Sequence, residues 1–479
     1  MAEEFVTEIT KKSEDFSEWY VQVVRRAELA DYSPLKGCMV IRPYGFTIWE
    51  NIQDALDRRL KETGHVNAYF PLFIPESFLS REAEHVKGFA PQVAWVTQGG
   101  DEILEERWAV RPTSEAIIGY MYSKWVRSWR DLPILINQWC NIVRWEKVTR
   151  LFLRTTEFLW QEGHTLHRTH EEALEEVLRI LEIYRDLVEN DLAIPVITGK
   201  KSPSEKFAGA LDTFTLEALM PDGKALQCGT SHDLGQNFSR AFEITFLDSD
   251  GQEKHAWSTS WGVSTRLIGG LIMVHGDDSG LIIPPRIAPY QVVIVPIFYG
   301  QEQEEVINKA RELRDLLKKS GIRVLLDDRD EYTPGWKFSE WELRGVPLRL
   351  EIGPRDLASS EAVLVRRDNR EKRRASWEAL PTVAPQVLES VQKSLFDRAK
   401  NFRETNTRES EDFSEFKKIM EEKRGFILSP WCGNEACEEE VKAQTTATIR
   451  CIKDEEPSGK MCLVCGNEAK FLAYFAKSY

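Results

Sequence analysis

Residues 138 to 164 constrain the fold more than any other stretch, because they predict two strands joined by a basic loop. The first arm alternates apolar and polar residues up to Trp145, and the returning arm carries apolar residues from Phe152 to Trp160. Such patterns are typical of half-buried strands. The loop between the arms runs from Lys147 to Arg150. We therefore predict a strand, a short loop and a returning strand.

Charged and aromatic residues lie on both predicted arms. Arg144 and Glu146 are two positions apart, so a strand would place them on the same face. Arg154 and Phe158 are four positions apart and would also share a face. Guanidinium groups bind phosphate, and an aromatic ring can stack on a base. The alternative is a surface hairpin with a cross-strand ion pair, a common and weak feature.

The order Arg-x-Glu, loop, Arg-x-x-x-Phe resembles the second signature motif of class II aminoacyl-tRNA synthetases, which forms their ATP site. The resemblance implies that Arg144 binds the α-phosphate and that Glu146 contacts the adenine amino group. It also implies that Arg154 holds the γ-phosphate and that Phe158 stacks on adenine. The expected nucleotide is ATP with Mg²⁺.

Two further stretches resemble the other class II motifs. Residues 46 to 63 predict a helix that begins with a Thr47-x-x-Glu50 capping box, and a strand containing Pro71 follows. In the family this first motif builds the dimer interface, so the resemblance implies a homodimer. The alternative is an edge strand that tolerates proline. In the third motif, Ser260 to Gly270, a strand leads into a helix, and Arg266 would cover adenine opposite Phe158.

Arg-Pro-Thr-Ser-Glu at 111–115 follows a predicted hairpin over 92–110, and Trp-Gln-Glu-Gly-His lies at 160–164. Thr113 and Glu115 also suit an ordinary helix start. The polar segment from Gln227 to Phe238 suits the rim of a nucleotide or substrate site better than a core strand, and the alternative is a polar turn joined to a strand over 242–247. The combination resembles prolyl-tRNA synthetase of the archaeal and eukaryotic type. The resemblance implies a proline-binding set of Thr113, Glu115, Arg144, Trp160, Glu162, His164, His232 and Ser264. It implies an ATP-binding set of Arg144, Glu146, Arg154, Phe158, Gln227, Thr230 and Arg266, with Arg144 and Arg266 as the catalytic residues.

Pro284 to Pro289 mark a boundary. Beyond them, predicted strands at 291–298, 322–326, 348–352 and 362–365 and a helix at 303–320 indicate an α/β layer with a mostly parallel sheet. This part resembles the anticodon-binding domain of class IIa synthetases. Lys337, Glu340 and Arg344 share one predicted helix face and are the candidate anticodon contacts. The basic run 366–374 is either a solvated hairpin tip or a contact for RNA backbone.

Five of the eight cysteines lie at or after position 432. The two pairs Cys432-x4-Cys437 and Cys462-x2-Cys465 have the spacing of a tetrahedral structural zinc site. Cys451 has no near partner in the sequence and is not assigned to the site. The aromatic tail from Phe471 to Phe475 is expected to dock and to carry Tyr479 toward the active site, a position that the family resemblance suggests.

We predict an α+β protein with three domains. These are a class II catalytic domain with an antiparallel sheet (1–285), an α/β anticodon-binding domain (286–388) and a small zinc-containing α/β domain (389–479). The net charge of −14 means that RNA contacts come from local basic patches. The acidic start lacks a signal-peptide core, and no apolar run approaches the ~20 residues that span a bilayer. We therefore expect a cytoplasmic protein without membrane contact.

The resemblance implies a proline–tRNA ligase, which activates proline with ATP and transfers it to the 3′ end of tRNA(Pro). One alternative is a class II synthetase for another small amino acid. The second alternative is an inactive paralogue that binds RNA or regulates another protein. Only residues 165–259 separate the second and third motifs, and a helix over 169–190 and several strands occupy most of them. We therefore expect no editing domain within the chain.

Overall fold

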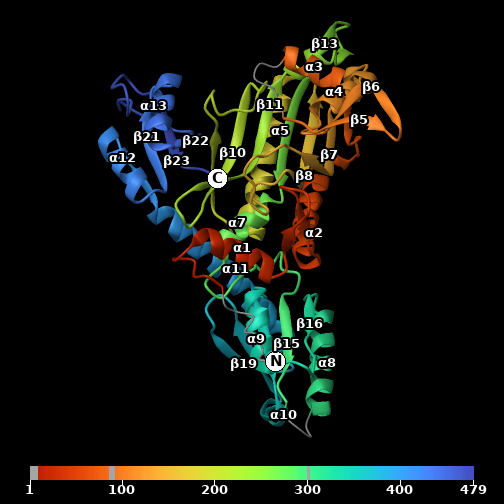
Figure 1. Ribbon diagram of the computed structural model, residues 1–479, viewed down its shortest axis with the longest axis vertical. Helices are drawn as coiled ribbons and strands as arrows, with labels where there is room; N and C mark the ends of the chain where they lie inside the picture. The colour runs from red at the N-terminus through yellow and green to blue at the C-terminus, as the bar shows by residue number, and fades with distance from the viewer. Residues whose placement is uncertain (1–8, 86–91, 299–302) are drawn as a thin grey trace.

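The computed structural model describes residues 9–85, 92–298 and 303–479, so the acidic start of the chain, residues 1–8, lies outside the description. Figure 1 shows a large central sheet, a separate α/β unit at one end of the long axis, and the C-terminal segment beside the central sheet. None of the described helices combines the length and the apolarity required to span a bilayer.

The central sheet has eleven strands in the order β20-β21-β23-β22-β9-β10-β11-β14-β8-β7-β3. Adjacent strands are antiparallel except in the pairs β20–β21 and β3–β7. This confirms the predicted antiparallel sheet and adds that the C-terminal strands extend it through β22. In sheet order the strands are β20 Thr407–Glu409, β21 Phe426–Trp431, β23 Phe471–Ala476, β22 Thr448–Lys453, β9 Val196–Lys200, β10 Asp212–Leu219, β11 Ala225–Gly235, β14 Trp257–Ser264, β8 Glu157–His167, β7 Ile134–Val143 and β3 Val66–Asn67.

The predicted hairpin exists, but its strands end earlier than the sequence pattern indicated. β7 ends at Val143 and β8 begins at Glu157, so Arg144, Glu146 and Arg154 all lie in the connecting segment. The prediction that strand geometry pairs these side chains is therefore wrong. Leu151 to Leu153 are buried in the core instead, and the carbonyl oxygen of Leu151 accepts a hydrogen bond from the Tyr20 hydroxyl at 2.7 Å. Tertiary packing thus overrides the local strand pattern.

Three helices pack beside the central sheet near the predicted motifs, namely α1 (Phe16–Arg26), α2 (Pro43–Glu62) and α7 (Arg266–His275). The first-motif helix α2 begins at Pro43, earlier than predicted. Its expected capping box is wrong, since the Thr47 hydroxyl donates to the carbonyl oxygen of Pro43. Proline at the first helical position sets the start, because it needs no hydrogen-bond acceptor there.

Helix α5 (His170–Asp186) lies against β10, β11 and β14. Its predicted capping box between Thr169 and Glu172 is confirmed, and a π-helical turn, Leu187–Asp191, continues it. The apolar spacing of 169–190 predicts Leu178 on the inner face of this helix, but Leu178 is 42% exposed, so that prediction is wrong.

A second sheet holds the predicted hairpin over 92–110. Its strands are β4 (Phe73–Pro75), β6 (Glu102–Val110) and β5 (Trp95–Gly99), and α3 (Glu76–His85) packs beside them. Helix α4 (Glu115–Trp125) follows. The apolar spacing after Glu115 predicts a helix that includes Trp129, but the helix ends at Trp125. The remaining small elements are a 3₁₀ turn at Trp129–Asp131, β1 Ala30–Tyr32, β2 Met39–Ile41, α6 Asn237–Ala241, β12 Thr245–Leu247 and β13 Glu253–His255.

The α/β unit has a five-stranded sheet in the order β16-β15-β17-β18-β19. The pairs β15–β16 and β15–β17 are parallel, whereas the pairs β17–β18 and β18–β19 are antiparallel. The expectation of a mostly parallel sheet is therefore wrong. The tight connection after β18 permits only an antiparallel partner. The elements are β15 Val292–Pro296, α8 Gln303–Lys319, β16 Val324–Leu326, α9 Pro334–Leu343, β17 Leu348–Ile352, α10 Pro354–Ser359, β18 Glu361–Arg366 and β19 Lys372–Ser376.

The long helix α11 (Leu380–Thr405) leads from the α/β unit to the C-terminal segment. That segment contains α12 (Phe413–Glu422) and α13 (Glu435–Thr445), which pack against each other. Phe416, Met420, Ile449 and Phe475 belong to a separate apolar core there. The C-terminal segment is therefore an α/β module that shares the central sheet.

Candidate active site

One face of the central sheet forms the floor of a cavity of about 590 Å³. The strand register brings residues from β8, β14, β11 and β10 into rows across this face, although they are far apart in the sequence. The aligned residues are His164, Ser260, His232 and Thr213 in one row, Glu162, Gly262, Thr230 and Thr215 in the next, and the neighbouring pairs Trp160–Ser264 and Gln227–Glu217.

The segment from Gln227 to Phe238 was expected to be a polar rim rather than a strand of the core. It is largely strand β11 in the middle of the sheet, so that part of the prediction is wrong. Its polar side chains Gln227, Thr230 and His232 nevertheless line the cavity. Alternation along the strand places Thr230 and His232 on the open face, and a bulge at Cys228 brings Gln227 to the same face. Helix α5 packs against this strand.

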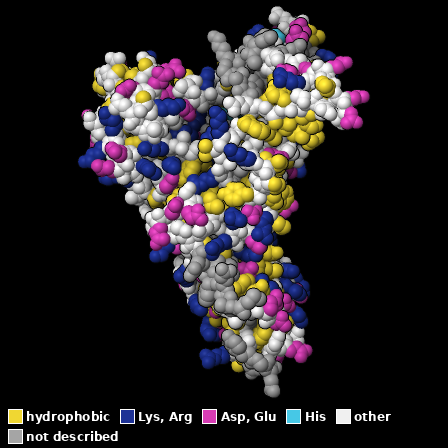
Figure 2. Space-filling model, in the orientation of Figure 1, with side chains coloured by type: hydrophobic (Ala, Val, Ile, Leu, Met, Phe, Trp, Pro, Cys, Tyr) yellow, Lys and Arg dark blue, Asp and Glu magenta, His cyan; other side chains and the backbone are white. Residues whose placement is uncertain are grey.

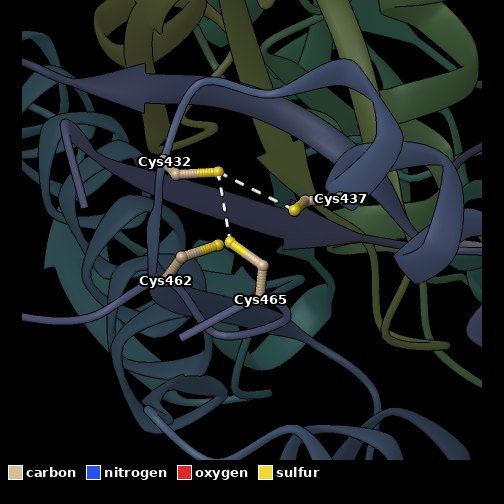
Figure 3. A group of neighbouring side chains, drawn as sticks. All are labelled: Cys432, Cys437, Cys462 and Cys465. Carbon is tan, nitrogen blue, oxygen red and sulfur yellow. Dashed lines mark hydrogen bonds between the residues drawn. The ribbon is translucent and has the colours of Figure 1, made fainter. Parts of the chain in front are cut away.

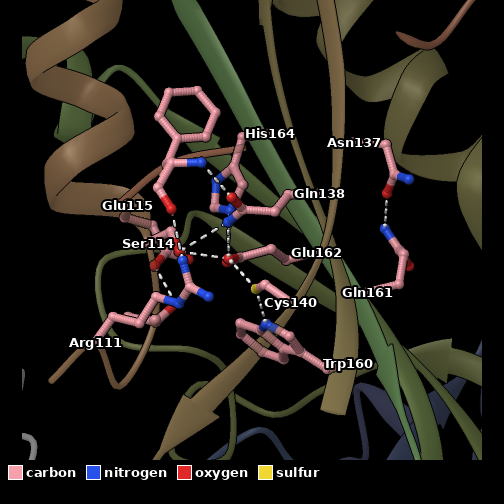
Figure 4. A network of polar contacts seen from close by, with 12 residues as sticks. Arg111, Ser114, Glu115, Asn137, Gln138, Cys140, Trp160, Gln161, Glu162 and His164 are labelled. Carbon is pink, nitrogen blue, oxygen red and sulfur yellow. Dashed lines mark hydrogen bonds and ion pairs between the residues drawn. The ribbon is translucent and has the colours of Figure 1, made fainter. Parts of the chain in front are cut away.

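Glu162 is the centre of a buried polar network (Figure 4). Its Oε1 accepts hydrogen bonds from the Gln138 amide at 2.8 Å and from the Ser114 hydroxyl. Its Oε2 accepts from Nε2 of His164 at 2.9 Å. Burial opposes ionisation of Glu162, but the hydrogen bonds from His164, Ser114 and Gln138 outweigh it and lower the pKa. Burial likewise opposes the charge on His164, yet the Glu162 carboxylate raises the pKa of that imidazole.

Thr113 and Ser114 precede α4, but neither acts as its cap. The Thr113 hydroxyl donates to the Glu115 carboxylate, and the Ser114 hydroxyl donates to Glu162. Ser114 is the N-cap residue by position and makes no side-chain capping bond. The ordinary helix-start explanation therefore does not account for these side chains, which are directed to carboxylates at the cavity wall.

Arg144 and Arg266 enter the cavity from two different elements. The Arg144 guanidinium lies 5.8 Å from the ring centre of Phe158 and 5.3 Å from that of Trp160, and its Nε donates to the carbonyl oxygen of Pro112 at 3.0 Å. Arg266 is the first residue of α7, as predicted, and its Nε donates to the carbonyl oxygen of Leu153 at 3.1 Å. Both guanidinium groups are thus held by backbone oxygens.

Every residue of the predicted proline-binding set lines the cavity, and so does every residue of the predicted ATP-binding set except Arg154. Arg154 is 57% exposed and forms an ion pair with Glu146 at 2.8 Å. His232 is neutral over the physiological range, because burial and the nearby charges of His164 and Arg144 lower its pKa to about 3.

The sequence patterns did not identify several residues at this site. Gln138 and Cys140 support Glu162 and Trp160 from behind, since the Trp160 indole N–H donates to the Cys140 sulfur at 3.2 Å. Lys201 and Phe207 line the cavity. Gln138 and Cys140 belong to the first predicted arm but carry no motif signal, and Lys201 and Phe207 follow β9 outside every motif.

The four predicted metal ligands Cys432, Cys437, Cys462 and Cys465 lie together, with all four sulfurs within 4.8 Å of one another (Figure 3). Two of the sulfur–sulfur distances are 3.7 Å. A tetrahedral zinc with bonds of about 2.3 Å requires sulfurs about 3.8 Å apart, so the group fits zinc. Burial raises the pKa of the Cys432 and Cys437 thiols. Burial would also raise the pKa of Cys462, but the backbone amides of Cys465 and Val464 lower it to about 7, so Cys462 forms the metal-binding thiolate more readily than those two.

Cys451 is not part of this group. It is buried on β22, where it faces Gly199 of β9. The C-terminal tail docks on the central sheet, as expected. The backbone N–H of Tyr479 donates to Ala225 at 3.1 Å, and its hydroxyl donates to Asp222 at 2.8 Å. Ala225 begins the strand that carries Gln227.

The three candidate anticodon residues lie on or just after α9 and make contacts inside the protein. Lys337 is only 2% exposed and donates to the carbonyl oxygen of Asp327 at 3.2 Å. Glu340 pairs with Arg344 at 3.2 Å, and Arg344 also contacts Glu28 of the catalytic part at 2.5 Å. Anticodon contact by these three residues stays a prediction.

A basic cavity of about 360 Å³ lies beside α9, and the basic run 366–374 supplies much of its wall. The run is the hairpin between β18 and β19, as the first interpretation proposed. The lining residues with charged or aromatic side chains include Phe338, Arg349, Arg366, Arg367, Arg370 and Lys372.

Family comparisons cover most of the chain. The description "tRNA synthetase class II core domain (G, H, P, S and T)" matches residues 95–275, "Anticodon binding domain" matches 291–386, and "Prolyl-tRNA synthetase, C-terminal" matches 413–479. Three curated relatives named proline–tRNA ligase match this chain over nearly the full length of both proteins. They come from Natranaerobius thermophilus (59% identical over 479 residues, 100% of this chain and 99% of the relative), Alkaliphilus oremlandii (59% over 477, 99% and 99%) and Rubrobacter xylanophilus (58% over 476, 99% and 100%).

These relatives come from bacteria, so the comparison supports the family and does not confirm the archaeal and eukaryotic subtype. The three matches follow the same order as the central sheet, the α/β unit and the C-terminal module. Together with the full-length identities and the cavity described above, they show that the chain belongs to the prolyl-tRNA synthetase family of class II aminoacyl-tRNA synthetases.

Proposed function

We propose that this chain is a proline–tRNA ligase that forms prolyl-adenylate from proline and ATP and then transfers the prolyl group to tRNA(Pro). One observation carries the proposal. A single cavity contains carboxylates and hydroxyls suited to a secondary ammonium beside two arginines suited to phosphates. Its substrate classes are therefore a small amino acid and a nucleotide.

The proline end of the cavity is formed by Thr113, Glu115, Trp160, Glu162 and His164. Glu115 accepts the ammonium of proline, and the Trp160 ring packs against the pyrrolidine. The ion pair between Glu162 and His164 fixes the imidazole at the wall. His232 and Ser264 complete the proposed proline-binding set. A small pocket with fixed acceptors favours a compact secondary amine over larger amino acids.

The nucleotide end uses positioning and charge rather than a covalent nucleophile. Phe158 and Arg266 enclose adenine, and Glu146 contacts its amino group. Arg144 binds both the proline carboxylate and the α-phosphate, which brings the attacking oxygen to the phosphorus. Arg154 reaches the γ-phosphate from the rim, and Gln227 and Thr230 contact the nucleotide.

Mg²⁺ is expected to enter with ATP. Within the ranges 9–85, 92–298 and 303–479, the cysteine group is the one cluster of three or more potential metal ligands. Mg²⁺ prefers oxygen ligands and often keeps most of them from water and substrate phosphates. The ion supplies charge neutralisation on the leaving pyrophosphate when it is bound.

We also propose structural Zn²⁺ at the four cysteines, a cytoplasmic homodimer, and the domain bounds 1–285, 286–388 and 389–479. The dimer is supported by exposed apolar side chains around the first motif, including Val66, Tyr69, Phe73 and Trp108. Figure 2 shows apolar side chains gathered on the same side of the central sheet as β6 and β7. The basic cavity beside α9 is the proposed contact for the tRNA backbone, together with the anticodon residues Lys337, Glu340 and Arg344.

The layout between β8 and β14 is consistent with the proposed lack of an editing domain in this segment. The structure describes all of this segment, and α5, the π turn, β9 to β11, α6, β12 and β13 occupy it. The archaeal and eukaryotic subtype is proposed on this compact layout and on the C-terminal cysteine module.

The test is amino-acid-dependent exchange of pyrophosphate into ATP, assayed across all amino acids with the purified protein. Proline is expected to give the highest rate. Stimulation by another small amino acid instead of proline would favour the first alternative. No exchange with any amino acid would favour the inactive paralogue.

A further inference from the structure

A buried charge cluster lies beside the nucleotide end of the cavity and has no part in the mechanism above. Glu217 on β10 is fully buried, and its Oε1 lies 2.8 Å from the Lys201 ammonium. The Arg450 guanidinium from β22 binds both Glu217 oxygens at distances of 3.0 to 3.1 Å. The Thr215 hydroxyl also donates to Oε1 at 2.9 Å.

The cluster holds two cations against one carboxylate. The side chains of Lys201, Glu217 and Arg450 are 2%, 0% and 7% exposed. Burial opposes ionisation of Glu217, but Lys201 and Arg450 outweigh it and lower its pKa. The carboxylate therefore stays charged, and one positive charge remains unmatched. A buried cation without a matching anion is unfavourable, so the cluster is suited to receive an anion.

Lys201 is the member of the cluster that reaches the cavity wall. An ammonium group has three donors, and Glu217 accepts from one of them. Glu217 is the one carboxylate that pairs with Lys201 across the part of the chain that the structure describes. The other two donors remain for a ligand.

The ammonium of Lys201 lies at the nucleotide end, although its backbone does not. The Lys201 N–H donates to the carbonyl oxygen of Thr213, in the row of His164 and His232, but the ammonium reaches Glu217. Glu217 pairs across the strands with Gln227, whereas the Glu162–His164 pair lies on β8, three strands from β10. Glu217 is also close enough to influence the charge on Arg266. The nucleotide end is where the proposed reaction places the phosphates of ATP, so a phosphate is the anion expected beside Lys201.

Arg450 reaches the cluster because β22 approaches β9 very closely. A Cβ atom at Gly199 would lie 2.4 Å from the backbone oxygen of Ile452 and 3.0 Å from the Cβ of Cys451. Glycine is therefore required at this crossing. The close approach lets a residue of the C-terminal module contact the sheet beneath the cavity.

We propose that Lys201 binds a phosphate of ATP, and that Glu217 and Arg450 are positioning residues that hold its ammonium at the cavity wall. The C-terminal module thus contributes to nucleotide binding through Arg450. The inference rests on the proposed function, since it takes ATP as the nucleotide.

The first experiment measures the proline-dependent exchange of pyrophosphate into ATP in the full-length protein. Lys201→Met keeps the length of the side chain and removes its charge. We expect the KM for ATP to rise about tenfold, the loss of one charge-assisted contact, and the KM for proline to change less than twofold. Lys200→Met is the matched control, because Lys200 is 43% exposed and pairs with Asp212. An unchanged KM for ATP in Lys201→Met, or equal changes for ATP and proline, would overturn the proposal.

The second experiment tests whether Arg450 acts through Lys201. Arg450→Met should raise the KM for ATP about as much as Lys201→Met does, and Arg450→Lys should restore much of the loss. The double variant should be no worse than Lys201→Met alone, because both changes remove the same contact. Additive effects would show that Arg450 has an independent role. Lys453→Met is the control, because Lys453 is on the same strand, has a side chain that is 36% exposed and pairs with Glu455 rather than Glu217.

Calorimetric titration with Mg·ATP keeps the proposal testable apart from activity. Thermal unfolding first shows whether each variant is folded. If a variant is not folded, Glu217→Gln is titrated in its place, because it changes the partner of Lys201. Weaker ATP binding by folded Lys201→Met than by Lys200→Met supports the proposal, and equal binding contradicts it. Wild-type protein that binds ATP but shows no proline-dependent exchange would contradict the proposed function and not this inference.

Discussion

The cavity and the cysteine group are both built from polar side chains, but they are held in place differently. In the cavity, Glu162 is bound by His164, Gln138 and Ser114, and the guanidinium of Arg144 is held by a backbone oxygen. The cysteine sulfurs lie within 4.8 Å of one another, and the side-chain contacts of Cys432 with Cys437 and Cys465 are between sulfurs. The polar groups of the cavity are held by other groups of the protein, whereas the proposed zinc would hold the four cysteines together. The cavity is therefore suited to catalysis, because preorganised groups stabilise the charge that develops in a reaction. The cysteine group is suited to a structural role, because closed metal sites stabilise a fold.

The largest loss of activity is expected for Arg144→Ala. It removes the guanidinium proposed to join the proline carboxylate and the α-phosphate, so adenylate formation should fall about 10³-fold. Pyrophosphate exchange measures the loss, and the melting temperature should stay close to that of the wild type. Arg130→Ala, an exposed arginine on the 3₁₀ turn, is the control. Near-normal exchange by Arg144→Ala would remove the basis of the proposed mechanism.

A smaller loss is expected for Arg266→Ala. The change removes one charge and one stacking surface over adenine but leaves Arg144 in place. We expect a fall of about 10²-fold in kcat/KM for ATP, from the same exchange assay. A loss as large as that of Arg144→Ala would mean that the two arginines act as one unit.

Removal of the proposed zinc tests the group of four cysteines. Cys462→Ser should reduce bound zinc from about one per chain to none, as measured by elemental analysis of protein purified without chelator. The catalytic sheet should stay folded. Exchange activity should fall about tenfold through the ATP KM, because Arg450 belongs to the same module. Cys451→Ser is the matched control and should keep the metal. Wild-type protein without zinc would contradict the metal assignment.

The smallest expected effect is the pH dependence of the Glu162–His164 pair. Burial lowers the pKa of His164, but the Glu162 carboxylate outweighs it and leaves the pKa above the ordinary 6.5. The free energy of unfolding that His164 contributes is therefore complete below pH 6.5 and is lost as the pH rises through the pKa of His164 in the folded protein. The pKa of Glu162 lies below its ordinary 4.5. The free energy of unfolding that Glu162 contributes is therefore present above pH 4.5 and is lost as the pH falls through the pKa of Glu162 in the folded protein. The pair should therefore contribute on the order of 1 kcal/mol between about pH 4.5 and 6.5 and less on either side.

Urea unfolding of the wild type and His164→Gln across this pH range measures that contribution. The difference between the two proteins should be largest inside the window and smaller at pH 8.5. A difference that does not vary with pH would mean that the pair contributes by packing alone. The cysteine module should not follow this profile, which separates the two regions again.

The sequence was sufficient for features that depend on local spacing. The two cysteine pairs, the Thr169 capping box, the turn before β6 and the position of Arg266 at the start of α7 were all predictable from neighbouring residues. The residues between Val143 and Glu157 were not, because Leu151 to Leu153 are buried against the N-terminal helix and their strand-like pattern reflects that core.

Residues that depend on strand register were the least predictable. Lys201, Glu217 and Arg450 lie in no common motif, and Gln138 supports Glu162 from a neighbouring strand. Gly163 shows the same dependence, since a Cβ there would lie 2.0 Å from the ring of Trp261 on the paired strand. The motif contains the glycine, but only the sheet explains it.

The sharing of one sheet by the catalytic part and the C-terminal module also orders the events of synthesis. β9 ends at Lys200, whereas its outer neighbour β22 begins at Thr448, after the whole α/β unit. While the ribosome makes the intervening chain, at roughly 5–20 residues per second, the outer edge of β9 has no partner. Unpaired strand edges promote association between chains. The nascent protein therefore passes through a period of exposure to aggregation that ends only when β22 emerges.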